Sequence, residues 1–321
     1  MRCLNRSIGI RIIKRVAHVV PIDPQQEIGM TVRHYVLALT LASFAIACHL
    51  AAAVDKPAQD KVVKFARFKV NDNITFGIVE GDKVREISGT IFGDWKKTDN
   101  VHALSDVMLM VPSRPRHVFA MAGNYKSHLK DVEIPPKFRI PQPFFKSPSS
   151  LVQHEGRIII PKDATEEVHF EAEMVVVIGK RARKVAKENA LDYVLGVTCG
   201  NDVSERYWQN DEENKDVQWW RAKGSDTFGP CGPFIVSGLN YDDLLLTLRL
   251  NGEVKQEERT SQMIHDVATQ VSFISKHVTL LPGDLIFTGT SGMTSALHPR
   301  DVVEVELEGV GILRNRVGRE R

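Results

Sequence analysis

Short segments in which apolar and polar residues alternate run through most of this 321-residue chain. An alternation with a period of two is typical of β-strands that bury one face. Residues 62–88 show it first, with turn signals at 71–73 and 80–82, and predict a small β-meander. From about residue 115 onward we expect further short strands, at residues 117–123, 157–161, 173–179, 193–200, 232–237, 244–252, 284–290 and 301–311.

Two segments have a helical pattern instead. Residues 187–194 form the shorter one, and residues 261–278 form the longer one. In the longer segment Ile264, Val267, Val271 and Ile274 recur at the spacing of one helix face. Many short strands with few helices predict a mostly β (α+β) fold, a sandwich or barrel-like roll.

The N-terminal region has a different pattern. From Met30, a short polar start is followed by an apolar run over residues 36–47 and by small residues at 51–53. The run is too short for a comfortable membrane span, and the layout predicts a secretory signal peptide cleaved near Ala53. An amphipathic or anchoring helix is the alternative. The protein is expected to be exported or periplasmic if this leader functions and cytoplasmic otherwise, with no stable span in the mature chain.

We therefore divide the chain into three parts. Residues 1–53 are an N-terminal extension with the signal peptide, residues 54–115 a small β-domain with a connector, and residues 116–321 the main domain. The apolar content of 43%, the charged content of 26% and the net charge of +2 are ordinary for a soluble globular protein. They suggest no nucleic-acid partner. The cysteines lack CxxC spacing, and no phosphate-binding glycine loop occurs.

Two glutamates stand beside a run of apolar residues. Glu171 and Glu173 precede the valines of residues 175–177. In a strand both side chains share one face, where two like charges are costly to bury unless a cation binds them. Asp202, where another apolar strand ends, offers a third carboxylate, and Mg²⁺ prefers such ligands. A solvated strand edge with a turn aspartate is the alternative, and from the acidic pair alone it is the commoner case.

Other polar residues point to catalysis. His128 precedes Asp131 by three residues, a helical spacing at which the carboxylate can orient the imidazole as a general base. Lys223 lies in a glycine-rich loop and can hold a substrate carboxylate or an enolate oxygen. Each of these residues taken alone is more often a surface side chain.

Seven ordered segments together resemble the fumarylacetoacetate hydrolase superfamily. They span residues 117–315 and read GNYKSH, PFFKSPSSLV, FEAEMVVVIGK, NDVSERYWQ, KGSDTFGPCGPFIV, LNGEVKQEERTSQMI and LLPGDLIFTGT. The resemblance implies a mixed β-sandwich roll, usually in a homodimer. It places the metal ligands on Glu171, Glu173 and Asp202, with Mg²⁺ as the usual ion and Mn²⁺ or Ca²⁺ as alternatives.

The same resemblance assigns roles to the remaining residues. It implies an active-site Lys223, a base at His128, and substrate contacts from Arg206, Gln209 and Thr290. Many hydrolytic and decarboxylating members carry Glu three residues after this histidine. Here Asp131 stands at that position and Glu133 follows two residues later, so either carboxylate is a candidate partner of His128.

The short length of residues 54–115 resembles the shorter members of the superfamily. We expect a Mg²⁺-dependent isomerase or C–C bond hydrolase of small 2-oxo (enol) dicarboxylates, similar to 2-hydroxyhepta-2,4-diene-1,7-dioate isomerase. An acylpyruvate hydrolase or an oxaloacetate decarboxylase is the alternative within the family. A non-catalytic, metal-stabilised binding protein is the alternative from another class.

Overall fold

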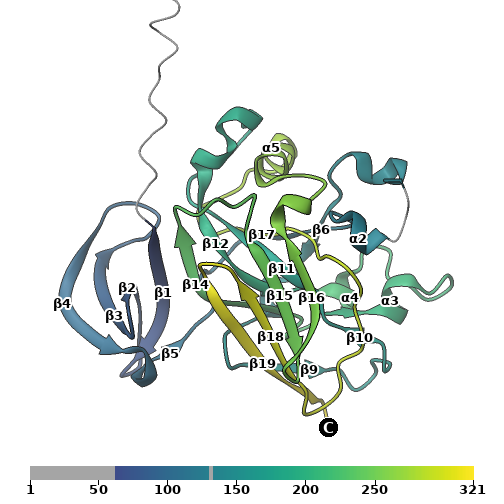
Figure 1. Ribbon diagram of the computed structural model, residues 1–321, viewed down its shortest axis with the longest axis horizontal. Helices are drawn as coiled ribbons and strands as arrows, with labels where there is room; N and C mark the ends of the chain where they lie inside the picture. The colour runs from purple at the N-terminus through teal and green to yellow at the C-terminus, as the bar shows by residue number, and fades with distance from the viewer. Residues whose placement is uncertain (1–61, 130–132) are drawn as a thin grey trace, which may run out of the picture. The chain divides into compact units, whose positions relative to one another are not determined.

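The computed structural model describes residues 62–129 and 133–321. The predicted extension and signal peptide of residues 1–53 lie outside the described residues, and so does Asp131. The described chain is built mainly from short strands, as Figure 1 shows, and the expected mostly β architecture is confirmed.

The largest sheet has twelve strands. Its main path runs in the order β4-β3-β2-β1-β14-β12-β11-β17-β6-β7, while β5 pairs with β1 and β8 with β14. Its strands are β1 (Val63–Val70), β2 (Asn73–Glu80), β3 (Lys83–Gly89), β4 (Trp95–Ala103), β5 (Met108–Leu109), β6 (Val118–Met121), β7 (Pro143–Lys146), β8 (Leu151–Val152), β11 (Ala172–Ile178), β12 (Val194–Asn201), β14 (Gly229–Ser237) and β17 (Leu285–Phe287).

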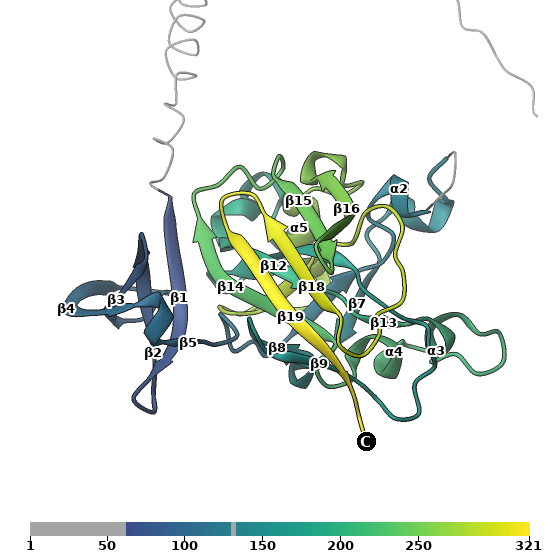
Figure 2. The same ribbon diagram turned by 60° about the horizontal axis from the view of Figure 1, so that its bottom comes forward.

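A second sheet has five strands in the order β16-β15-β18-β19-β9. The antiparallel strands β18 and β19 run side by side in Figures 1 and 2. The strands of this sheet are β9 (Arg157–Ile160), β15 (Leu245–Leu250), β16 (Glu253–Arg259), β18 (Val302–Leu307) and β19 (Gly311–Arg319). A third, two-stranded sheet pairs β10 (Val168–His169) with β13 (Ser204–Glu205).

One large apolar core joins the two larger sheets. Met174, Val176 and Ile178 of β11 belong to the same buried cluster as Leu246 of β15 and Val305 of β18. Because side chains alternate along a strand, the odd-numbered residues of β11 face the other way. That second face packs in a separate core with the N-terminal strands.

The strands β1 to β4 form the predicted meander and extend it by one strand. They continue the main sheet, because β1 pairs antiparallel with β14. Phe65, Ile78 and Ile87 from these strands share a buried cluster with Val175 and Phe287 of the central strands. The N-terminal strands therefore complete a core that the rest of the chain shares.

The helices are short. They are α2 (Lys126–Leu129), α3 (Arg206–Asn210), α4 (Trp220–Gly224) and α5 (Val267–His277), together with 3-10 turns at Leu104–Asp106, Pro136–Arg139, Pro148–Ser150, Lys187–Tyr193 and Thr260–Gln262. Within residues 62–129 and 133–321 no helix is long and apolar enough to cross a membrane.

The helix predicted for residues 261–278 begins later than its apolar pattern. Asp266 caps α5 by accepting a hydrogen bond from the Thr269 N–H (2.7 Å). Ile264 lies before the cap, and its N–H donates to the Asn124 carbonyl (2.7 Å). The apolar spacing therefore included Ile264, which lies outside the helix because its backbone contacts Asn124. The predicted helical segment at 187–194 is a 3-10 helix, Lys187–Tyr193.

Candidate active site

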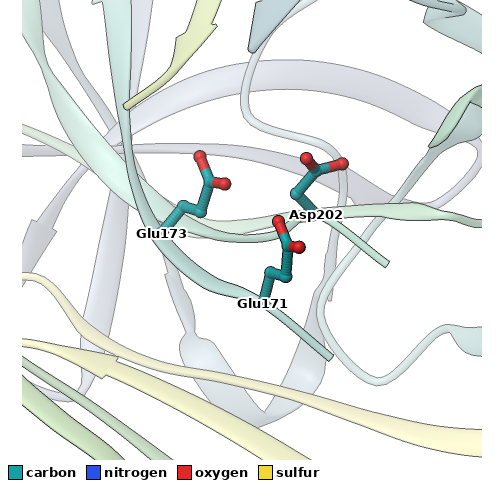
Figure 3. A group of neighbouring side chains, drawn as sticks. All are labelled: Glu171, Glu173 and Asp202. Carbon is teal, nitrogen blue, oxygen red and sulfur yellow. The ribbon is translucent and has the colours of Figure 1, made fainter. Parts of the chain in front are cut away.

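The antiparallel pairing of β11 with β12 brings the three predicted acidic residues together. Glu171 immediately precedes β11, Glu173 lies within it, and Asp202 immediately follows β12. The Asp202 N–H donates to the Glu171 carbonyl (2.9 Å), which continues the register beyond the strand ends. Each residue offers one carboxylate oxygen, and these oxygens lie within 4.8 Å of one another. Figure 3 shows the side chains converging on a common region.

The register also places a glycine opposite Glu173. Glu173 pairs with Gly200 of β12. A Cβ at this position would lie 2.4 Å from Val175 Cγ2 and 2.6 Å from Phe287 Cε1. Glycine is therefore needed here, because a larger side chain would collide with the core beside the carboxylates.

All three carboxylates are buried, and buried cations meet them. Glu171 is 4% exposed, whereas Glu173 and Asp202 are each 1% exposed. Lys223 Nζ donates to Glu171 Oε2 and to Asp202 Oδ2, both at 2.8 Å. On the described part of the chain, the other cations paired with these carboxylates are Arg206, 2.7 Å from Glu171 Oε1, and Lys146, 2.5 Å from Asp202 Oδ1.

The surroundings shift the protonation of the two glutamates in opposite directions. Burial alone would raise the pKa of Glu171, but Lys223 and Arg206 hold this pKa well below its usual range. Burial raises the pKa of Glu173, and the nearby Asp202 and Glu171 raise it further. Glu173 is therefore the carboxylate that most lacks a positive neighbour.

Lys223 carries a positive charge. Burial lowers its pKa, but Asp202 and Glu171 outweigh this effect, and the pKa ends above its ordinary value. A lysine held in its charged form has no free lone pair. Lys223 is therefore suited to stabilise negative charge and not to act as a base or as a nucleophile in this state.

The three carboxylates fit a hard divalent cation. They supply oxygen donors from one small, buried region, which is the ligand type that Mg²⁺, Mn²⁺ and Ca²⁺ take. A cation would also relieve the repulsion that raises the pKa of Glu173. Glu173 is oriented for this by Gly289, whose N–H donates to its Oε2 (2.7 Å).

A cavity of about 460 Å³ opens beside the acidic cluster. Five of the predicted residues line it: His128, Glu171, Gln209, Lys223 and Thr290. They come from segments far apart in the chain, so the fold assembles them.

Aromatic side chains form another wall of the same cavity. Phe144 and Trp219 both line it, and their rings meet edge to face at 5.3 Å. Lys223 Nζ lies 5.6 Å from the centre of the Phe144 ring. Trp219 has φ of 56°, a strained conformation for a residue other than glycine, directly before the helix that carries Lys223. The cavity therefore has a charged end and an apolar side.

Neighbouring side chains position the predicted substrate-binding residues. Gln209 Oε1 accepts a hydrogen bond from Arg206 Nη1 (2.7 Å), one turn earlier in α3. Thr290 Oγ1 accepts from Gln256 Nε2 (2.9 Å) of β16. Arg206 lines an adjoining cavity and reaches the acidic cluster through Glu171.

His128 has a backbone partner. Its Nδ1 lies 2.8 Å from the Gly292 carbonyl oxygen. Of the two carboxylates considered as its partner, Asp131 lies outside the described residues, and Glu133 makes no hydrogen bond or ion pair with His128. Among the described residues, a carbonyl of the loop after β17 is therefore the hydrogen-bond partner of this imidazole.

Lys146 belongs to the site, although the sequence assigned it no role. It is 2% exposed, and its Nζ donates to Asp202, to the Lys223 carbonyl and to the Phe228 carbonyl. Burial lowers its pKa despite the neighbouring Asp202. Its signals in the sequence were its place in the segment PFFKSPSSLV, which carries part of the family resemblance, and its position as a charged residue directly after two phenylalanines.

Comparison with known proteins places the chain in a family. The family model described as fumarylacetoacetate (FAA) hydrolase C-terminal matches residues 117–318. A second model, described as Rv2993c-like, N-terminal, matches residues 63–112. Protein Rv2993c of Mycobacterium tuberculosis is 38% identical over 268 residues, which cover 80% of this chain and 99% of that protein.

Two solved structures are similar to the chain along most of its length. One is 5-carboxymethyl-2-hydroxymuconate delta-isomerase from Mycobacterium smegmatis, 37% identical with a TM-score of 0.73, covering 80% of this chain and 100% of that one. The other is 2-hydroxyhepta-2,4-diene-1,7-dioate isomerase from Mycobacterium marinum, 38% identical with a TM-score of 0.73, covering 80% and 99%. With its family match and its buried acidic cluster, the chain belongs to the fumarylacetoacetate hydrolase family, as one of its short members.

Proposed function

We propose that the protein is a metal-dependent isomerase of small 2-oxo (enol) dicarboxylates. The observation that carries this proposal is the buried trio Glu171, Glu173 and Asp202 beside a cavity that contains Lys223 and His128. A 2-oxo acid can chelate a cation through a carboxylate oxygen and the adjacent oxygen. Mg²⁺ is our first choice of ion, because carboxylate oxygens are the ligands it prefers.

The chain supplies the remaining chemistry. A bound divalent cation provides Lewis-acid stabilisation of an enolate oxygen. Lys223, held in its charged form, adds a second positive centre within the cavity. His128 takes a proton from one position of the substrate and returns it at another, which shifts a double bond.

Isomerisation is preferred over hydrolysis for two reasons. Both of the similar solved structures reported above bear the names of isomerases. In addition, the family resemblance implies a glutamate three residues after the histidine in many hydrolytic and decarboxylating members, and this chain has Asp131 there. In a hydrolase, His128 would instead activate a water molecule for attack on a distal carbonyl. Acylpyruvate hydrolysis and oxaloacetate decarboxylation remain the alternatives.

Turnover of a substrate panel tests the proposal. The purified protein is incubated with a hydroxymuconate-type dienoate, an acylpyruvate and oxaloacetate, each with Mg²⁺ and with EDTA. We expect Mg²⁺-dependent isomerisation of the dienoate, followed as a change in ultraviolet absorbance. Cleavage products from the acylpyruvate would favour the hydrolase. Binding of these acids without any metal-dependent turnover would contradict the proposal and favour a non-catalytic binding protein.

Lys223→Ala is predicted to lower kcat by roughly 10²–10³-fold, as expected when one preorganised donor is lost from an active site. Because this lysine also neutralises Glu171 and Asp202, the thermal stability of the variant must be measured alongside its rate. Lys276→Ala is the matched control, since Lys276 is exposed near the end of α5. Equal rates for the two variants would remove Lys223 from the mechanism.

Two further expectations concern the whole protein. We propose that it forms a homodimer, which light scattering coupled to gel filtration measures directly. We also propose export, for which mass spectrometry of the native protein should find a mature N-terminus near Val54. A native chain that still carries residues 30–53 would contradict cleavage at this site.

A further inference from the structure

Gly292 is held at both its N–H and its carbonyl by two consecutive residues of α2. Its carbonyl oxygen lies 2.8 Å from His128 Nδ1, and its N–H donates to Ser127 Oγ (3.0 Å). Ser127 Oγ in turn donates to Glu258 Oε2 (2.5 Å) on β16. The loop after β17 and the helix that carries the candidate base are thus joined through one residue, Gly292.

We propose that Gly292 is the positioning residue for His128, and that its carbonyl fixes the ring tautomer needed for proton transfer. The reasoning rests on the proposed function only for the role of His128 as the base. A carbonyl oxygen can accept a hydrogen bond but cannot donate one, so Nδ1 must carry the proton. In the neutral ring the lone pair is then on Nε2.

The environment of His128 agrees with this assignment. His128 lines the cavity that also contains Lys223 and Glu171. On the described part of the chain, its Nε2 has no hydrogen-bond partner. Among residues 62–129 and 133–321, nothing thus occupies the nitrogen with the lone pair, which suits it to contact a substrate.

The loop that presents this carbonyl is anchored to β16 at several points. Gln256 Nε2 donates to Thr290 Oγ1 (2.9 Å) and to the Ser291 carbonyl. Glu258 holds the next residue indirectly, through Ser127. These contacts fix residues 290–292, so the carbonyl is held in place by the five-stranded sheet.

The backbone conformation explains why glycine occupies this position. Gly292 has φ of +56°, and a Cβ added to it would meet no atom within 4 Å. Alanine therefore fits sterically but disfavours the conformation that aims the carbonyl at Nδ1. Gly292→Ala should act mainly through the orientation of the peptide and not through a clash.

Gly81→Ala is the matched control for this change. Gly81 has φ of +67° with nothing within 4 Å of an added Cβ, and it lies in the turn between β2 and β3. Both variants should lose similar stability, but only Gly292→Ala should lose activity. We expect kcat to fall by about 10–100-fold with little change in KM, a part of the 10²–10⁴-fold that a general base contributes.

The tautomer is measured independently of turnover. Two-bond ¹H–¹⁵N correlation spectra of the ¹⁵N-histidine-labelled full chain report which ring nitrogen carries the proton, and His128→Gln assigns the signals. We expect a protonated Nδ1 in the wild type and in Gly81→Ala, and a mixture of tautomers in Gly292→Ala. Ser127→Ala removes the hydrogen bond to the Gly292 N–H and should shift the mixture in the same direction. This variant serves if Gly292→Ala does not fold.

The outcomes separate this inference from the proposed function. A wild-type ring protonated on Nε2, or an unchanged tautomer in both Gly292→Ala and Ser127→Ala, would overturn the role of the carbonyl whatever the enzyme does. The expected tautomers without turnover of any substrate would leave the positioning of His128 intact and contradict the catalytic proposal instead.

Discussion

Glu171 and Glu173 show how strongly the neighbours of a residue decide its charge. They are two residues apart and equally deep in the protein, yet their pKa values move in opposite directions. Glu171 has Lys223 and Arg206 within 2.8 Å, whereas among the described residues Glu173 receives only the Gly289 N–H. The two glutamates therefore make opposite contributions to the folding stability of the metal-free protein.

Glu173→Gln is predicted to stabilise the protein in EDTA near pH 8. Because the folded pKa of Glu173 is raised, its stabilising contribution is complete below its unfolded pKa and is lost as the pH rises through the folded value. The neutral amide avoids this loss, so the melting temperature should rise by a few degrees. Each kcal/mol added to the free energy of unfolding raises it by about 2–4 °C. The advantage should shrink as the pH falls toward about 4.5.

Glu171→Gln is the control of opposite sign. The depressed pKa of Glu171 stabilises the folded protein above its unfolded pKa, and this stability is lost as the pH falls through the folded value. The amide variant should therefore melt at a lower temperature than the wild type near pH 8. Both variants should also lose the stabilisation that Mg²⁺ gives the wild type. Melting curves that move in the same direction in EDTA would contradict the assignment.

The sequence predicted the acidic residues better than their partners. Glu171, Glu173 and Asp202 stand beside apolar strands, where charge is unexpected, and the family motifs mark the same positions. Lys146 and the Gly292 carbonyl contact the site only through tertiary structure. Their partners Asp202 and His128 are 56 and 164 residues away along the chain, so no local pattern shows these contacts.

At the scale of elements, the register between β11 and β12 determines the geometry of the site. Glu171 and Asp202 lie opposite each other because Ala172 pairs with Asn201 one residue further in. A slip of one residue would move every side chain of a strand to the other face. Apolar patterns predicted both strands, whereas their pairing follows only from the assembled sheet.

Gly200→Ala should destabilise the protein by about 1–3 kcal/mol, since an added methyl group overpacks a filled core. The contacts at 2.4 Å with Val175 and 2.6 Å with Phe287 leave it no space. Gly93→Ala is the control, because its added Cβ would meet Thr90 Cγ2 at an ordinary 3.4 Å. Urea unfolding measures both variants, and equal midpoints would show that the strands can separate to accept the methyl group.

Helix boundaries were predicted less well than strands. The apolar spacing of residues 261–278 included Ile264, but α5 starts only after the Asp266 cap. The cap was present in the sequence, yet the pattern extended across it. A helix start is therefore set by a local hydrogen bond that hydrophobic periodicity alone does not detect.

At the scale of the whole molecule, the N-terminal strands and the central sheet share a core. Phe65 of β1 is 4% exposed and belongs to the same buried cluster as Val175, Val177 and Phe287. The sequence predicted a small N-terminal β-domain with a connector at residues 54–115. In the structure β1 hydrogen-bonds with β14, so the main sheet crosses that proposed boundary.

Calorimetry should therefore show a single unfolding transition for residues 62–321. Phe65→Ala is predicted to cost about 3–5 kcal/mol, as for other buried aromatic residues, and to lower the melting temperature of the whole protein. Ile74→Ala, in the neighbouring strand but 49% exposed, should change it little. A separate early transition that moves alone in Phe65→Ala would show that the N-terminal strands unfold as an independent unit.

The cations around the acidic cluster have a consequence for the order in which the protein meets its ligands. Lys146, Lys223 and Arg206 pair with Asp202 and Glu171, whereas the raised pKa of Glu173 favours its neutral form in the metal-free protein. Under the proposed function, a divalent ion adds two positive charges at this cluster and strengthens its attraction for a doubly charged acid. We therefore expect the ion to bind first and the acid second.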